Sequence, residues 1–134
     1  MNDAFLLDTC AVVWLANDMK ILQAAEDAID GSRRLCVSAA SAWEIGMLIS
    51  RGKIPTTSHA LAWFERFVSR AGINAIDITP SVMIAASYLP VPLHKDPADR
   101  IIIATAREHD LTIVTRDRAI LAYGAAGHVK TLAC

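Results

Sequence analysis

Four acidic residues in this chain occupy positions at which ligand chemistry is expected in an α/β protein. Each follows a predicted strand closely or lies in the early turns of a predicted helix, and they are Asp8, Glu44, Asp99 and Asp117. In an open parallel α/β sheet, the carboxyl ends of the strands and the amino ends of the helices share one edge, where ligands bind. We therefore expect four carboxylates from distant parts of the sequence to converge at that edge.

Four carboxylates gathered at one edge require a counter-charge. Two like charges about 5 Å apart repel by about 3 kcal/mol at an effective dielectric constant of about 20. Mg²⁺ and Mn²⁺ are hard cations that prefer oxygen ligands and retain bound waters, and no histidine or cysteine cluster offers a softer metal site. An all-carboxylate site suits phosphodiester hydrolysis, because metal ions lower the pKa of the attacking water and stabilise the leaving oxygen.

The segment DPADRIIIATA, residues 96–106, places Asp99 at the head of an apolar stripe. Apolar residues follow it at +3, +4 and +7, which is the spacing of a helix face that packs on the core. A structural role is also open. Asp96 can cap this helix with Pro97 at the first position, and Asp99 can then complete a capping box.

The other three acids have structural alternatives too. Ser41 and Glu44 have the spacing of a capping box, which would make Glu44 part of a helix start. If Ser38 is the cap instead, Glu44 lies too deep in the helix for that role. Asp8 and Asp117 can each begin a turn.

Short β-rich runs alternate with helical patterns along the whole sequence. Strands are predicted at 4–7, 35–38, 73–78, 111–115 and 128–132, and helices at 10–16, 20–29, 39–51, 58–70, 81–89, 96–106 and 118–123. This alternation predicts a parallel sheet with helices on both faces. We see no repeat or linker that would divide the chain, so one domain is expected over residues 1–134.

Composition limits the classes of protein that fit. Apolar residues make up 54% of the 134 residues and the net charge is −1, so any contact with nucleic acid must be local rather than a matter of bulk charge. The three cysteines show no CxxC spacing, which fits a reducing compartment. No apolar run approaches the roughly 18 residues of a membrane span, and the start lacks a signal-peptide pattern. We therefore expect a cytoplasmic protein without membrane segments.

Three blocks of the sequence resemble the signature blocks of a known family. They are LLDTCAVVWLA, LCVSAASAWEIGMLISRGKI and DPADRIIIATAREHDLTIVTRD. In this order they resemble PIN-domain ribonucleases, and among these the VapC-type toxins of bacterial toxin–antitoxin pairs. The resemblance spans nearly the whole chain. It implies a three-layer α/β/α sandwich with a central parallel sheet, a Mg²⁺- or Mn²⁺-dependent endoribonuclease, and a cognate VapB-type antitoxin.

The resemblance also assigns roles to individual residues. The four acids match the family's catalytic and metal-binding quartet. Thr9 follows the first acid as a small hydroxyl residue, and the hydroxyl of Thr115 is placed to position a metal-bound water. Asp96 matches the DPAD block, where we expect it to cap the helix or support the quartet. Cys10 departs from the histidine or small polar residue common in relatives, at a position with no ligand role.

Basic and aromatic residues near the acids give weaker indications. Arg100 and Arg116 flank the quartet and are expected to contact RNA phosphates, as is His94. Ordinary pairing with the neighbouring acids is the alternative for all three. Trp14 and Trp43 each lie close to an acid, and core or interface roles are favoured over base stacking.

Other acidic α/β modules fit the sequence less well. A phosphoacceptor receiver domain requires paired acids near its first strand and a pocket lysine near its last, but Asp3 stands well before Asp8 and Lys130 lies inside a predicted strand. A haloacid-dehalogenase phosphatase requires DxD at the first strand, where this chain has Asp8-Thr-Cys10. A PIN-like or receiver-like binding module without nuclease activity remains the alternative function.

Partners follow from the apolar composition together with the resemblance. We expect a homodimer with further apolar surface that receives a helix of the antitoxin. The expected groove is built by the helices around Trp14, residues 20–29 and residues 43–47, close to the acids. A basic antitoxin side chain, preferably arginine, would then reach the four carboxylates and compete with the metal.

Overall fold

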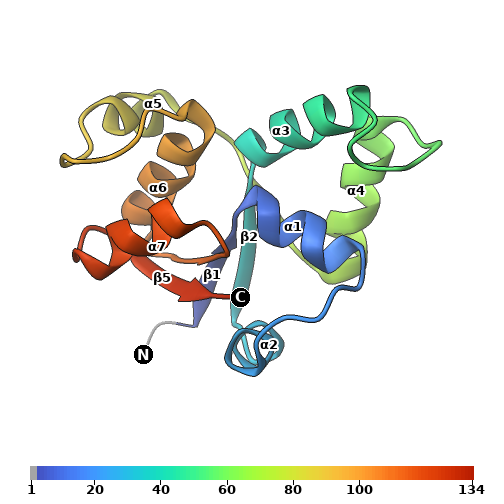
Figure 1. Cartoon of the computed structure of the whole chain (residues 1–134), viewed down its shortest axis with the longest axis horizontal. Helices are drawn as coiled ribbons and strands as arrows, with labels where there is room; N and C mark the ends of the chain where they lie inside the picture. Colours follow the sequence, from blue (N-terminus) through green and yellow to red (C-terminus); the bar gives the residue numbers. More distant parts are fainter. Residues whose placement is uncertain (1–2) are drawn as a thin grey trace.

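A five-stranded parallel sheet forms the centre of the computed structural model, which describes residues 3–134 (Figure 1). The strands are β1 (Ala4–Leu7), β2 (Arg34–Ser38), β3 (Asn74–Ile76), β4 (Thr112–Thr115) and β5 (Lys130–Ala133), in the spatial order β3-β2-β1-β4-β5. The order reverses at β1, because the chain adds β2 and β3 on one side and β4 and β5 on the other. All four strand pairings are parallel, as the strand–helix alternation predicts.

Seven helices within residues 3–134 cover the sheet. They are α1 (Thr9–Ala16), α2 (Gln23–Asp30), α3 (Ala39–Ser50), α4 (Ala60–Ala71), α5 (Pro80–Ser87), α6 (Pro97–His109) and α7 (Arg118–Ala125). No helix within residues 3–134 has both the length and the apolar character needed to cross a membrane.

Two hydrophobic cores lie on opposite faces of the sheet. Strand β1 is buried throughout and alternates between them, with Leu6 in one core and Leu7 in the other. The Leu6 core includes side chains of α5, α6 and α7, among them Ile102 and Ile103 of α6. The Leu7 core includes side chains of α1, α2 and α4, and α3 contributes to both. The three-layer α/β/α class expected from the sequence is therefore confirmed.

The expected elements are all present, with shifts at some ends. The helix expected from residue 20 begins at Gln23, because Leu22 is extended and the carbonyl of Lys20 accepts a hydrogen bond from Trp14 Nε1 at 2.8 Å. The last strand begins at Lys130 rather than residue 128, after a turn in which Gly127 has φ of 91°. The strand expected at 73–78 is limited to Asn74–Ile76, at the edge of the sheet.

Close packing of α7 on β5 depends on Gly124. A Cβ atom on Gly124 would lie 2.4 Å from Oγ1 and 3.0 Å from Cβ of Thr131, so rotation of the threonine side chain does not relieve the clash. We expect Gly124→Ala to lower the free energy of unfolding by about 1–3 kcal/mol, the usual cost of overpacking. Denaturant unfolding monitored by circular dichroism measures this change.

Gly46 of α3 provides the matched control, because a Cβ atom there meets nothing within 4 Å. Gly46→Ala should leave stability unchanged or raise it by up to about 1 kcal/mol through helix propensity. Equal stability of the Gly124→Ala protein and the unmodified chain would contradict the close approach of α7 and β5.

Candidate active site

Two of the four predicted acids, Asp8 and Asp117, are placed by helix starts at the carboxyl edge of the sheet, and Asp96 is placed by a third helix start. Asp8 ends β1 and caps α1 by accepting from the backbone N–H of Ala11 at 2.8 Å. Asp117 follows β4 and caps α7 in the same way. Asp96 caps α6, with Pro97 at its start, and its side chain accepts from the N–H of Asp99. The caps at Asp8 and Asp117 place acids at the ends of strands, and all three caps satisfy helix N–H groups that have no partner within the helix.

Glu44 reaches the same edge from inside a helix. Ser38 is the cap of α3, accepting from the N–H of Ala40 at 3.0 Å, so the capping-box interpretation of Ser41 and Glu44 is wrong. Glu44 lies in the second turn, and its carboxylate accepts a hydrogen bond from the hydroxyl of Thr9 at the start of α1. That threonine hydroxyl also lies 3.0 Å from Oγ of the buried Ser41, so Thr9 joins α1 to α3.

Asp8 is the most buried of the acids, with 2% of its surface exposed. One of its oxygens accepts from Ala11, and the other accepts from the hydroxyl of Thr115. The same hydroxyl accepts from the backbone N–H of Asp117 at 2.9 Å. Thr115 therefore links Asp8 to Asp117 across the neighbouring strands β1 and β4, whereas the sequence assigned it to a metal-bound water.

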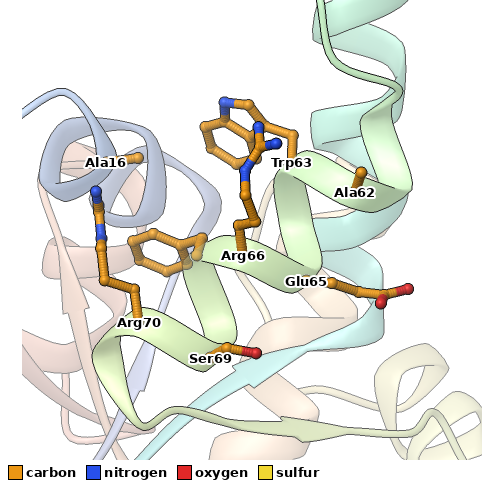
Figure 2. Close-up of a pocket in the computed structure, with 8 residues that line it drawn as sticks. Ala16, Ala62, Trp63, Glu65, Arg66, Ser69 and Arg70 are labelled. Atoms are coloured by element: carbon orange, nitrogen blue, oxygen red, sulfur yellow. The ribbon is translucent and has the colours of Figure 1, made fainter.

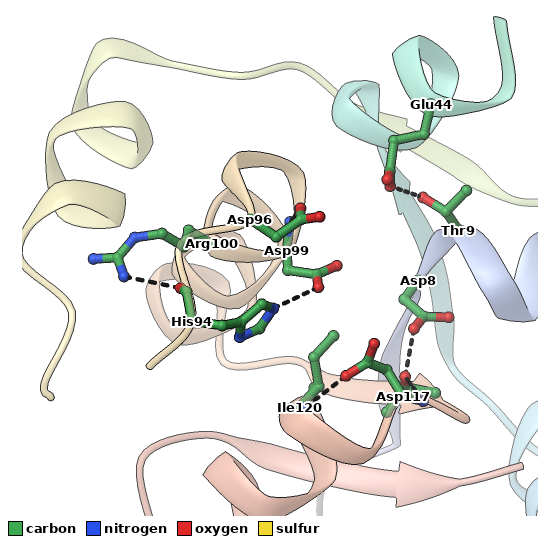
Figure 3. A network of polar contacts seen from close by, with 10 residues as sticks. Asp8, Thr9, Glu44, His94, Asp96, Asp99, Arg100, Asp117 and Ile120 are labelled. Atoms are coloured by element: carbon green, nitrogen blue, oxygen red, sulfur yellow. Dashed lines mark hydrogen bonds and ion pairs between the residues drawn. The ribbon is translucent and has the colours of Figure 1, made fainter. Parts of the chain in front are cut away.

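Asp99 points toward the other acids and is held from behind by a histidine. Its carboxylate Oδ2 lies 2.7 Å from Nε2 of His94 (Figure 3). It therefore does not serve as the reciprocal arm of a capping box with Asp96. The pairing alternative considered for His94 is the one that the structure shows, and the imidazole approaches an acid rather than open solvent.

The two predicted arginines differ in position. Arg116 lines the acidic pocket, where its guanidinium lies 4.2 Å from the centre of the Trp14 ring and donates to the carbonyl of Cys134 at 3.0 Å. Arg100 points away from the acids and donates to the carbonyls of Ala86 and His94 (Figure 3). The geometry therefore places Arg116 at the acidic pocket, whereas Arg100 holds the loop before α6.

All four acids line one pocket of about 520 Å³, together with Asp96, Cys10, Trp14 and Arg116. Burial raises the pKa of Asp8 to about 6, although hydrogen bonds from Thr115 and Ala11 oppose the shift, and the charges of Asp99 and Asp117 add to it. Burial likewise raises the pKa values of Glu44 and Asp99. The expected convergence of the acids is thus observed, as mutual electrostatic coupling within one pocket.

The thiol of Cys10 is affected by the negative charges of the same acids. Its pKa is raised to about 11, chiefly by burial and then by the charges of all four acids. No ligand role was expected for Cys10, and its position directly after Asp8 and Thr9 puts it on the pocket wall. A thiol held in its neutral form contributes no additional negative charge to the pocket.

A model of the PIN domain matches residues 5–125 of the chain. This range contains β4, all of β1 except its first residue, and every acid of the pocket. The chain belongs to the PIN-domain family. Membership excludes the receiver and haloacid-dehalogenase alternatives, which are different folds.

Known relatives of this PIN domain agree with the assignment. Ribonuclease VapC22 of Mycobacterium tuberculosis is 36% identical over 116 residues, which cover 86% of this chain and 88% of that protein. A chain of VapBC2 from Rickettsia felis, bound to a promoter DNA fragment, superposes with a TM-score of 0.71 at 15% identity, covering 97% of this chain and 98% of that one. A chain of DNA-bound VapBC from Salmonella typhimurium gives 0.70 at 20% identity, covering 99% and 98%.

The donor chemistry of this PIN domain fits a hard divalent cation. The acids offer oxygen ligands, and Asp8, Glu44 and Asp117 have no lysine, arginine or histidine within ion-pair distance in the described chain. As they stand, no three acidic, histidine or cysteine side chains within residues 3–134 are gathered closely enough to hold an ion. Binding would therefore have to draw the carboxylates together against their mutual repulsion.

The raised pKa of Asp8 predicts a pH-dependent stability. Between pH 4 and 6 the folded protein holds a proton that the unfolded chain releases, so metal-free stability should fall as the pH rises through this range. Asp8→Asn keeps a helix cap but removes the ionisation. Above pH 6 it should raise the free energy of unfolding by up to about 3 kcal/mol, and it should flatten the profile.

Denaturant unfolding in EDTA from pH 4 to 8 measures both effects. Asp77→Asn, which neutralises an exposed carboxylate after β3, is the control and should leave the profile of the unmodified chain unchanged. If the Asp8→Asn profile coincides with that of the unmodified chain between pH 4 and 6, burial of a charged Asp8 is not a cost to folding.

Proposed function

We propose that this PIN domain, as one domain over the whole chain, is a Mg²⁺- or Mn²⁺-dependent endoribonuclease and the toxin of a toxin–antitoxin pair. The observation that carries the proposal is the acidic pocket, in which four carboxylates lie together and three of them lack a basic partner within residues 3–134. The name of the 36% identical relative, Ribonuclease VapC22, supports RNA as the substrate.

The four acids are proposed to hold the metal and, through it, the reacting water. A bound divalent ion would supply an activated water and a positive charge opposite the leaving oxygen. In this chain Thr115 holds Asp8 in place and ties it to Asp117, while Thr9 holds Glu44. These hydroxyls restrict the carboxylates to orientations that face the pocket, which lowers the entropic cost of assembling the site.

RNA contact is proposed at the rim of the pocket. Arg116 is exposed, its guanidinium is supported by Trp14, and it lies on the same pocket as the acids. A guanidinium in this position can bind a phosphate of the strand while the acids act on the neighbouring one. This local cation reconciles an RNA substrate with a net charge of −1.

Asp99→Asn tests the nuclease assignment. It should reduce Mg²⁺-dependent cleavage of end-labelled RNA by about 100-fold or more, because a carboxylate that holds the metal is lost. EDTA should abolish cleavage by the unmodified chain. Circular dichroism and melting should show that the variant remains folded.

Glu108→Gln is the matched control, since it changes a carboxylate near the other end of the same helix and should cleave at the normal rate. Undiminished cleavage by Asp99→Asn at saturating Mg²⁺ would remove Asp99 from the site. If the unmodified chain binds RNA but does not cleave it, the alternative of a PIN-like binding module takes the place of a nuclease.

Exposed apolar surface supports two protein partners. Met83, Ile84 and Tyr88 are 50%, 62% and 83% exposed on and just after α5, and we propose this face for a homodimer. The exposed Leu22 and Trp43 flank the groove expected for an antitoxin helix. The VapBC names of the structural neighbours support a VapB-type partner.

A second hollow extends the surface available to the antitoxin. It has a volume of about 780 Å³ and lies along α4 beside the end of α1, at Ala16 (Figure 2). Trp63 stacks on Phe67 there, with ring centres 6.2 Å apart, and Arg66 and Arg70 flank the aromatic pair. Aromatic residues next to arginines are typical of energetically important interface positions.

Co-expression with the product of the neighbouring gene tests the partner assignments. We propose that the pair acts in the cytoplasm. Light scattering should give a dimer mass for the chain alone and a larger complex after co-expression. RNA cleavage by the complex should be suppressed and should recover partly at rising Mg²⁺, because a basic antitoxin group and the metal compete for the same carboxylates. A complex that cleaves as fast as the free chain would contradict an inhibited toxin.

A further inference from the structure

Asp99, His94 and Arg100 form a closed ring of contacts behind the acidic pocket. The imidazole Nε2 of His94 lies 2.7 Å from Oδ2 of Asp99. The backbone carbonyl of His94 accepts from Nη1 of Arg100 at 3.3 Å, and Arg100 follows Asp99 directly on α6. Arg100 in the first turn of α6 thus holds the backbone of His94, and the His94 ring in turn contacts the carboxylate of Asp99 in the same turn.

Arg100 also fixes this loop to the rest of the molecule. Its Nε donates to the carbonyl of Ala86 on α5 at 3.0 Å. Leu93, next to His94, packs against the hydrophobic core, and the carbonyl of Pro90 accepts from the hydroxyl of Tyr123 at 2.7 Å. The loop that carries His94 is therefore fixed from three sides, by α5, α7 and the core.

Within the described chain, the ring of His94 makes one polar contact, which is with Asp99. Its Nδ1 is buried and has no hydrogen-bond partner among residues 3–134, and the residue is not part of the wall of the acidic pocket. Because Nδ1 has no partner there, the contact of Nε2 with Asp99 is the side-chain polar contact of this ring within the described chain. The other oxygen of Asp99, Oδ1, takes part in no hydrogen bond within the described chain.

We propose that His94 is a positioning residue, and that His94 with Arg100 orients Asp99 toward the divalent metal. The proposal rests on the proposed metal-dependent function. Side chains that hydrogen-bond a metal-binding group fix its orientation, and their loss typically weakens metal binding by about 10- to 100-fold. Arg100 thereby gains a role through Asp99 in place of the RNA contact expected from the sequence.

Mn²⁺ titration of the RNA-free protein, followed by electron paramagnetic resonance, tests the proposal. His94→Ala should weaken Mn²⁺ binding by at least about 10-fold while the metal-free melting temperature shows that the protein is folded. His94→Gln keeps a side-chain N–H donor and should stay within about threefold of the unmodified chain. His109→Ala, a histidine near the other end of α6, should bind Mn²⁺ normally.

A double-mutant cycle separates positioning from a general structural effect. If His94 acts through Asp99, then His94→Ala in an Asp99→Asn background should cause no further loss of Mn²⁺ affinity. Arg100→Gln loosens the loop without changing either side chain and should weaken binding less than His94→Ala. This variant tests the same ring of contacts if His94→Ala does not fold.

Several outcomes would overturn the proposal. Unchanged or tighter Mn²⁺ binding by His94→Ala would do so, and tighter binding would mean that the imidazole competes with the metal for Oδ2. An equal loss in the Asp99→Asn background would also do so, as would normal binding by Arg100→Gln when His94→Ala is unfolded. If the unmodified chain itself does not bind Mn²⁺, the proposed metal-dependent function fails together with this inference.

Discussion

The carboxyl group of Asp8 has to remain at the centre of this protein and carry a charge there. It ends the central strand, caps α1 and lies almost entirely out of contact with water. The free-energy cost of burying this charge raises the pKa of Asp8 to about 6, chiefly through burial, and the charges of Asp99 and Asp117 add to the shift. A fold that keeps these acids together despite their repulsion is stabilised by any group that neutralises them. A bound cation or a basic group of a partner would therefore raise the stability of the folded state.

Sheet topology explains how the acids that repel one another are brought together. The strand order reverses at β1, so β1 and its neighbours β2 and β4 present their carboxyl ends side by side. The helices that follow begin there, and the side chains that cap them include Asp8 and Asp117. Asp8 and Asp117 therefore each have a local structural role as caps, and the collective electrostatic effect of the four acids arises from the parallel arrangement.

Much of this could be predicted from the sequence. Periodicity located every strand and helix, and the positions of the acids at strand ends predicted their convergence, because both depend on local patterns and on a general property of parallel sheets. The position of Glu44 was left open by two possible caps, and the structure decides for Ser38. Helix and strand ends shifted where a tertiary contact intervenes, as at Lys20, whose carbonyl is bound by Trp14.

The parts that could not be predicted depend on the paths of loops and on surface shape. Pairing of His94 with a neighbouring acid was one of two alternatives, but nothing in the spacing singles out Asp99 or places the imidazole behind its carboxylate. Arg100 follows Asp99, but the helical rotation between consecutive residues turns its side chain toward α5 instead of the pocket. The hollow along α4 needs the end of α1 beside Trp63 and Phe67, a relation between segments about 50 residues apart.

The most direct test of the central claim is the melting temperature of the metal-free protein as Mg²⁺ is added at constant ionic strength. If the four acids form a cation site, Mg²⁺ at ten times its dissociation constant should stabilise the native state by about 1.4 kcal/mol, which raises the melting temperature by several degrees. The Asp8→Asn protein should melt at a higher temperature without metal and respond less. A melting temperature that is indifferent to Mg²⁺ up to tens of millimolar would show that the four acids do not form a cation site.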